Sequence, residues 1–329
     1  MTINVGIVTA EALVLGCDSI ASITEHLLDP FRQNVTDNAD GSMRIDFDMD
    51  DLVPTVTGAW GGVTKMFELS QSPPVAAVTA GLAKLNGLNM SSLASEFAAT
   101  RQAQQAAHSA PVTVEDVATA FLKFMRTRYE QHYADSPLPE QFRDGPEFLI
   151  GGFGTADAFP SLYQVSVQEN SCHLDYGGGE CGATWGGQSD AVERLLRGYD
   201  DEIRSKVDSH YKGAMRIYRA EVARAVAELL NRFAVQAGSV ADDLPLRLPE
   251  LPKVSAWGKK ALQIEYADLP LQDAVDLVAF LVNLQSGRAK FGSGIATVGG
   301  RTHVGVITKQ RFVMLEEPQL KQTNTGFTS

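Results

Sequence analysis

The sequence predicts an α+β fold, a four-layer αββα sandwich in which two stacked antiparallel sheets are flanked by helices. Strand patterns come in neighbouring pairs joined by short turns, and helical patterns lie between these pairs, so a doubly wound nucleotide-binding fold is not expected. The 329 residues are 44% hydrophobic, enough for one large domain or two modest ones. We expect a single domain over residues 1–329, with insertions at about 25–60 and 200–256.

The chain begins with a hairpin. Every second residue of Ile3–Val8 is a large aliphatic one, the period of a half-buried strand, and Leu13–Cys17 is continuously apolar, as in a strand buried on both faces. The loop Thr9–Ala12 is short enough to join them as a hairpin, which brings Asp18 level with Thr2. An ordinary hairpin whose Asp18 caps the following turn remains the alternative at this point.

Paired strands and paired helices are expected in the first half of the chain. The acidic segment 29–51 opens like a calcium loop but lacks the loop's glycine and terminal glutamate, so we interpret it as a solvated loop. The next expected elements are strands Val63–Leu69 and Val75–Thr79, then helices Ser91–Ala107 and Val114–Gln131, the second with Thr113 and Asp116 as a capping box.

The second half of the chain repeats the pattern of strands followed by helices. A proline-punctuated linker around Pro245, Pro249 and Pro252 separates the last two helices. The expected strands are Glu147–Phe153, Leu162–Val167, Cys172–Tyr176, Arg301–Thr308 and Arg311–Leu315, and the expected helices span about 189–197, 210–235 and 268–284.

Composition excludes several classes of function. The formal net charge of −12 argues against a nucleic-acid surface, and no stretch approaches a membrane span of roughly 20 apolar residues. The N-terminus lacks the features of a signal peptide, and the 3 cysteines form neither a disulfide framework nor a CxxC pair, so we expect a cytoplasmic protein. The 6 histidines never fall at metal-ligand spacing, and we expect no metal and no cofactor.

Three glycine-rich segments have structural interpretations. Residues 151–158 suggest a phosphate loop, but the turn leads into a strand and not into a helix N-terminus. We interpret 176–191 as a structural turn before a helix that Ser189 or Asp190 caps, and 291–300 as a flexible approach to the last hairpin.

The N-terminus offers chemistry of its own. Threonine is small enough to permit removal of Met1, and we expect that removal alone to expose Thr2. A free α-amino group has a pKa of about 7.7–8.0 and can act as general base for the neighbouring hydroxyl. Such a nucleophile also needs a cation, an acid that places the cation, and backbone N–H groups for the oxyanion.

The segment TINVGIVTAEALVLGCDSIAS resembles the start of a mature proteasome β subunit, a family of N-terminal nucleophile (Ntn) hydrolases. VTKMFEL is similar to the strand that bears the family's active-site lysine, and PVAAVTAGLAKLNG to the strand whose following glycine forms the oxyanion hole. The resemblance implies that Thr2 is the nucleophile, Lys65 the cation, Asp18 the acid beside it, and Gly81 the oxyanion donor.

The resemblance also implies a function. It indicates a divergent bacterial proteasome homologue: a threonine-type endopeptidase that cleaves peptides or unfolded proteins, assembles as a homo-oligomeric ring or stack, and has an ATP-dependent unfoldase as a possible partner. The chain departs from the family at Ile20, at Gly186, where the family has a serine, and in the region 294–302, where it has an aspartate and a serine. In the family this aspartate and serine support the N-terminal amine, and Ser189, Ser293 or Thr297 are candidates to take over that role here. A catalytically silent ring or scaffold subunit and a small-amide Ntn hydrolase remain the alternatives.

Overall fold

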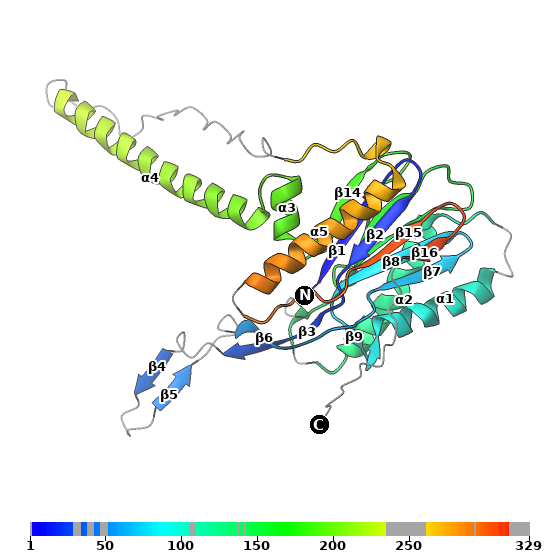
Figure 1. The fold of residues 1–329 in the computed structure, drawn as a ribbon. Coiled ribbons are helices and arrows are strands. Elements are labelled where there is room, and N and C mark those ends of the chain that lie inside the picture. Colours follow the sequence, from blue (N-terminus) through cyan, green and yellow to red (C-terminus); the bar gives the residue numbers. More distant parts are fainter. Residues whose placement is uncertain are drawn as a thin grey trace, which may run out of the picture. The chain divides into compact units, whose positions relative to one another are not determined.

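The computed structural model describes residues 2–28, 34–37, 43–46, 52–105, 110–136, 138–140, 143–234, 261–292 and 294–315 (Figure 1). Two compact units are distinguished, Met1–Ser189 with Ile264–Ser329 as the first and Asp190–Gln263 as the second. The expected mixture of helices and antiparallel sheets is confirmed. The division into a single domain with two insertions stays a prediction.

The first sheet contains the N-terminal hairpin. Its strand order is β14-β1-β2-β15-β16, and all four pairings are antiparallel. The hairpin was predicted with the bounds that the structure shows. The strands are β1 (Ile3–Val8), β2 (Leu13–Cys17), β14 (Gly182–Gly187), β15 (His303–Ile307) and β16 (Phe312–Met314).

The second sheet has the order β13-β12-β11-β8-β7 and is also antiparallel. Each of its strands overlaps a predicted one. The strands are β7 (Met66–Gln71), β8 (Pro74–Gly81), β11 (Pro146–Gly152), β12 (Ser161–Ser166) and β13 (Ser171–Tyr176), and a small ladder of β9 (Lys84–Leu85) with β10 (Leu88–Asn89) follows β8.

Apolar side chains fix how the first unit packs. Helices α1 (Met90–Gln105) and α2 (Val114–His132) contact the second sheet over one cluster, and the two sheets contact each other over another. Helix α5 (Leu271–Phe291) contacts β1, β2 and β15. A Cβ on Gly16 would lie 2.2 Å from a methyl carbon of Val278, so the glycine permits the close approach of α5 to β2.

Helices α1 and α2 lie close to their predicted bounds, whereas α5 differs from its prediction. Thr113 and Asp116 form the expected capping box at the start of α2. Helix α5 continues to Phe291, well beyond the expected end, and the short 3₁₀ turn η3 (Tyr266–Asp268) precedes it.

The second unit consists of helices in its described residues. Helix α3 (Asp190–Leu196) was expected, but α4 (Asp201–Ala234) begins about nine residues before the predicted start. The early start of α4 has a local cause, because Asp200 caps the helix. Its carboxylate accepts a hydrogen bond of 2.7 Å from Ile203 N and forms an ion pair with Arg194. The linker prolines lie outside the described residues.

Two expectations about the loops were wrong. The segment 29–51 is not simply a loop, because β4 (Asn34–Asp37) pairs with β5 (Met43–Asp46). In the sequence they lie between β3 (Ala21–Leu28) and β6 (Leu52–Trp60), which form a separate antiparallel pair. The glycine-rich segment 176–191 contains strand β14, whose pairing with β1 holds residues of low strand propensity in the sheet.

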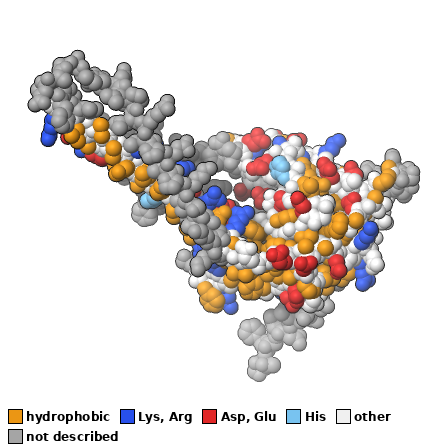
Figure 2. Space-filling model, turned by 90° about the horizontal axis from the view of Figure 1, so that it is seen from above, with side chains coloured by type: hydrophobic (Ala, Val, Ile, Leu, Met, Phe, Trp, Pro, Cys, Tyr) orange, Lys and Arg blue, Asp and Glu red, His pale blue; other side chains and the backbone are white. Residues whose placement is uncertain are grey.

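Acidic side chains occur across the face of the molecule in Figure 2, interspersed with basic and apolar ones. No helix in the described part of the chain has the length and apolar character that a membrane crossing requires.

Candidate active site

The first hairpin brings the two ends of its sequence together. The register pairs Asn4 with Cys17, so the residues just before β1 lie beside those just after β2. A hydrogen bond of 3.2 Å from Ile3 N to Asp18 Oδ1 joins these ends directly. At the opposite end of the hairpin, Thr9 Oγ1 donates to Ala12 O (3.1 Å) and closes the turn. The structure therefore places Asp18 beside Thr2, as the hairpin geometry predicts.

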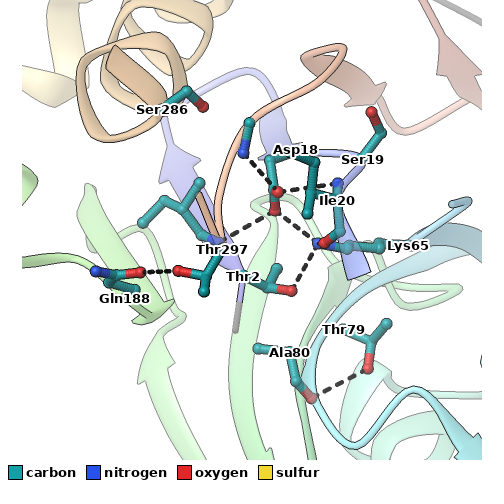
Figure 3. A network of polar contacts seen from close by, with 12 residues as sticks. Thr2, Asp18, Ser19, Ile20, Lys65, Thr79, Ala80, Gln188, Ser286 and Thr297 are labelled. Carbon is teal, nitrogen blue, oxygen red and sulfur yellow. Dashed lines mark hydrogen bonds and ion pairs between the residues drawn. The ribbon is translucent and has the colours of Figure 1, made fainter. Parts of the chain in front are cut away.

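Lys65, which immediately precedes β7, reaches both residues. Its Nζ atom donates to Thr2 Oγ1 at 2.6 Å and to Asp18 Oδ1 at 2.7 Å, and a third hydrogen bond goes to Ile20 O (Figure 3). Thr2 and Lys65 are each 4% exposed and Asp18 is 1% exposed, so the three side chains form a buried polar cluster. An ammonium has three N–H donors, and these three acceptors use all of them.

The Asp18 carboxylate connects the other parts of the site through four hydrogen bonds. Its Oδ1 accepts from Lys65 Nζ and Ile3 N, and its Oδ2 accepts from Ile20 N (3.1 Å) and Gly299 N (3.0 Å). All four partners are N–H donors, which matches the acceptor capacity of a carboxylate. The carboxylate thus holds the first strand, the segment after β2, the segment before β15 and the lysine in one arrangement.

Burial shapes the electrostatics of the site. Burial lowers the pKa of the Lys65 amine, and the charge and hydrogen bond of Asp18 act in the opposite direction. Burial also raises the pKa of the adjacent Cys17 thiol to about 12, so this cysteine is a poor nucleophile. The hydroxyl of Thr2, with a cation 2.6 Å away, is the better candidate.

Gly81 lies at the end of β8, opposite Pro146 of β11. Its φ of +78° is in the left-handed region, and a Cβ would lie 2.4 Å from Gly145 O, so no other residue fits without a backbone shift. The preceding residue, Ala80, lies near Thr2 in Figure 3. The structure places Gly81 close to the site through its neighbour, and its oxyanion role stays a prediction.

Gln188 is a residue of the site that the sequence did not predict. Gln188 N donates to Thr2 O at 2.7 Å, and Thr297 Oγ1 donates to Gln188 Oε1 at 2.7 Å, so these two residues support the backbone of Thr2. Thr297 was a named candidate for support, whereas Gln188 was not. Ser189 is buried, and Ser293 lies outside the described residues.

The segment before β15 is part of the site and not only an approach to the last hairpin. Gly299 N donates to Asp18 Oδ2, Gly299 O accepts from Ser19 N at 3.1 Å, and Ser19 Oγ accepts from Arg301 N at 2.7 Å. The sequence signal was the glycine-rich composition, because a backbone that must donate and accept at close range favours glycine. Among the described residues, no group of three histidine, cysteine or acidic side chains could hold a metal ion.

Comparisons with known proteins give a distant likeness. No protein-family model matches the sequence, and no curated protein matches it. Among solved structures, the chain is similar to the Gly-1 mutant of Anbu from Hyphomicrobium sp. strain MC1, with 10% sequence identity, coverage of 96% of this chain and 85% of that chain, and a TM-score of 0.43. Because the identity and the score are this low, the geometry of the site has to carry the functional conclusion.

Proposed function

We propose that the chain is a threonine peptidase of the N-terminal nucleophile class, which hydrolyses amide bonds through Thr2 after Met1 is removed. The observation that supports this most strongly is the buried contact of Lys65 Nζ with both Thr2 Oγ1 (2.6 Å) and Asp18 Oδ1 (2.7 Å). We further infer that the two sheets and the helices that contact them form the four-layer αββα arrangement of Ntn hydrolases.

The lysine prepares the nucleophile. Because all three Nζ donors meet acceptors, the side chain is suited to be an ammonium, and the positive charge stabilises negative charge as it develops on Thr2 Oγ1. The hydroxyl still carries its own hydrogen, which a base must take. The free α-amine of Thr2 is within the same residue and has a reference pKa of about 7.7–8.0, close to neutral pH.

The reaction then has two halves. Thr2 Oγ1 attacks the carbonyl carbon of the substrate amide, the α-amine takes the hydroxyl proton, and the carbonyl oxygen becomes an oxyanion, which Gly81 N–H stabilises in our proposal. The C–N bond breaks, and the leaving amine receives the proton. A water molecule next attacks the ester on Thr2, which releases the acid and restores the hydroxyl.

Asp18 and Gln188 are positioning residues in this scheme. Asp18 holds the Lys65 ammonium through a 2.7 Å hydrogen bond, and Gln188 N holds the Thr2 carbonyl at 2.7 Å. Fixing both the cation and the backbone of the nucleophile reduces the entropy that the reaction must lose. Neither residue contacts a substrate in this proposal.

The assembly and partners follow from the sequence resemblance and from no contact in the structure. We propose a cytoplasmic homo-oligomeric ring or stack that acts on peptides or unfolded proteins, with an ATP-dependent unfoldase as a possible partner. A small-amide Ntn hydrolase would use the same site and differ in its pocket.

One observation favours a catalytically silent ring or scaffold subunit instead. Gly186 lies beside Asn4 in the β1–β14 ladder, and a Cβ there would meet nothing within 4 Å. The related family has a serine at this position, so the chain lacks a hydroxyl where space for one exists. Retention of Thr2, Lys65 and Asp18 in one cluster weighs against the silent subunit.

Intact mass spectrometry with a β-lactone tests the proposal. We expect loss of Met1 and one covalent adduct on the peptide that begins with Thr2, because ring opening by Oγ1 adds the whole lactone. Thr2→Ala should abolish the adduct. Thr9→Ala, which changes a buried threonine just beyond the other end of β1, should retain it. An adduct-free protein that has lost Met1 would favour the silent subunit.

A further inference from the structure

A cavity of about 240 Å³ is lined by residues that lie near Thr2 and Gly81 in the chain. It is lined from the first sheet by Asn4 and Gly186 and from the second sheet by Ala80 and Glu147, among others. Asn4 is two residues from Thr2, a distance of about 7 Å along an extended strand. Ala80 immediately precedes Gly81. A group bound in this cavity would therefore lie close to an amide bond held at the Thr2 hydroxyl.

Asn4 brings an unused acceptor to this cavity. The residue is 1% exposed, and its Oδ1 has no hydrogen-bond partner among the described residues. Its register partner Cys17 belongs to the apolar cluster between the sheets, so the Asn4 side chain also points between the sheets. A buried acceptor without a partner is costly, and a ligand with an N–H donor would satisfy it.

Two carboxylates face the same cavity. Glu147 of β11 and Glu169 of the turn between β12 and β13 belong to its lining, which contains His173 but no lysine and no arginine. In the described part of the chain, no hydrogen bond or ion pair reaches the Glu147 carboxylate. Partial burial, and secondly the charge of Glu169, raise the pKa of the Glu147 carboxyl. Both causes disfavour its negative charge, and a bound cation would offset both.

We propose that this cavity is a subsite for a guanidinium or amine group of the substrate, held by Asn4 Oδ1 and the carboxylates of Glu147 and Glu169. The inference rests on the proposed function, since the cation is a part of the substrate whose amide bond Thr2 cleaves. A guanidinium fits best, because its several N–H donors can reach an amide oxygen and a carboxylate together. The subsite would favour peptides with an arginine near the cleaved bond.

Probe binding to a variant that cannot cleave the probe tests the subsite separately from catalysis. The probes are N-acetyl-arginine methylamide and its citrulline analogue, which has nearly the same shape without the charge. With Thr2→Ala, we expect the arginine probe to bind about tenfold more tightly than the citrulline probe, as for a charge-assisted hydrogen bond. Adding Glu147→Gln should remove most of this difference. Adding Glu11→Gln, the same change in the exposed β1–β2 turn, should preserve it.

The subsite proposal and the peptidase proposal are contradicted by different results. Equal binding of the two probes, or no binding of either, overturns the subsite, whether or not Thr2 reacts with the lactone. Charge-selective binding that depends on Glu147 supports the subsite, even if Thr2 shows no adduct and the peptidase proposal is lost. The citrulline comparison needs no change at Glu147, so it decides the question even if the Glu147→Gln variant folds poorly.

Discussion

The Nζ atom of Lys65 lies 2.6 Å from Oγ1 of Thr2, although 63 positions separate the two residues in the chain. The contact joins the two sheets, because Thr2 precedes β1 of the first and Lys65 precedes β7 of the second. The same ammonium donates to Asp18, so the lysine is held by the residue that also fixes the start of β1. This shared buried contact makes stability and reactivity depend on the same atoms.

Replacing Lys65 should lower both stability and reactivity. Lys65→Met leaves the Asp18 carboxylate buried without its cation, and we expect the free energy of unfolding to fall by about 3–5 kcal/mol. Loss of the charge beside Oγ1 should slow β-lactone labelling of Thr2 by about 10²-fold or more. Denaturant unfolding and timed mass spectrometry measure the two effects.

Two further variants test the cause of the Lys65→Met effect. Lys84→Met changes an exposed lysine and should leave both measurements unaltered. The double variant Asp18→Asn with Lys65→Met removes the unpaired charge and should recover part of the lost stability, without recovery of labelling. Equal labelling by Lys65→Met and the unchanged protein would show that the cation is not needed.

The rate of Thr2 labelling should depend on pH in a bell shape. It rises as the α-amine loses its proton around its reference pKa of about 7.7–8.0. It falls again as Lys65 loses its proton, and burial places that fall below the ordinary lysine range by lowering the lysine pKa. Asp18→Asn removes an influence that raises the Lys65 pKa, so the alkaline fall should move to lower pH. If the alkaline fall moves to higher pH in this variant, its assignment to deprotonation of Lys65 is contradicted.

A methyl group at Gly187 should disturb the nucleophile selectively. Gly187 has φ +75°, and a Cβ would lie 2.0 Å from Thr2 O, whereas at Gly178, with φ +65°, nothing lies within 4 Å. Both alanine variants carry the left-handed backbone cost of about 1–2 kcal/mol, but only Gly187→Ala must also displace Thr2. We expect about a 10²-fold loss of labelling in Gly187→Ala alone, since a shift of about 1 Å is enough. Similar loss in Gly178→Ala would indicate a general effect of stability.

Cys17 should resist thiol reagents despite its position next to the site. Its side chain is buried, and burial raises its pKa to about 12, so only about one thiol in ten thousand is ionised at pH 8. Cys181 is only partly buried. Iodoacetamide followed by peptide mapping should label Cys181 first and Cys17 only on unfolding. Labelling of Cys17 at the rate of Cys181 would show that the site opens in the native protein.

The parts of the fold that follow a clear period could be predicted from the sequence. The hairpin of β1 and β2 has alternating and then continuous apolar residues, and its bounds match the structure. The meeting of Asp18 with Thr2 follows from that hairpin, because two short strands leave little choice of register. The approach of Lys65 could not come from local pattern, since it depends on how two sheets pack.

The elements that were missed depend on tertiary pairing. Strand β14 contains glycines and few branched residues, and it is a strand because β1 pairs with its whole length. Gln188 follows that strand, so its contact with Thr2 O became visible only with the strand in place. The hairpin of β4 and β5 lies in an acidic segment whose composition is typical of loops.

Trapping the acyl-enzyme is the most direct test of the central claim. A peptide amide is mixed with the protein that has lost Met1, the mixture is quenched in acid within milliseconds to minutes, and the N-terminal peptide is analysed by mass spectrometry. We expect the acyl half of the substrate on Thr2, release of the amine half, and neither with Thr2→Ala. Amine release at the same rate from Thr2→Ala, or no release at all with Thr2 exposed, would contradict the account.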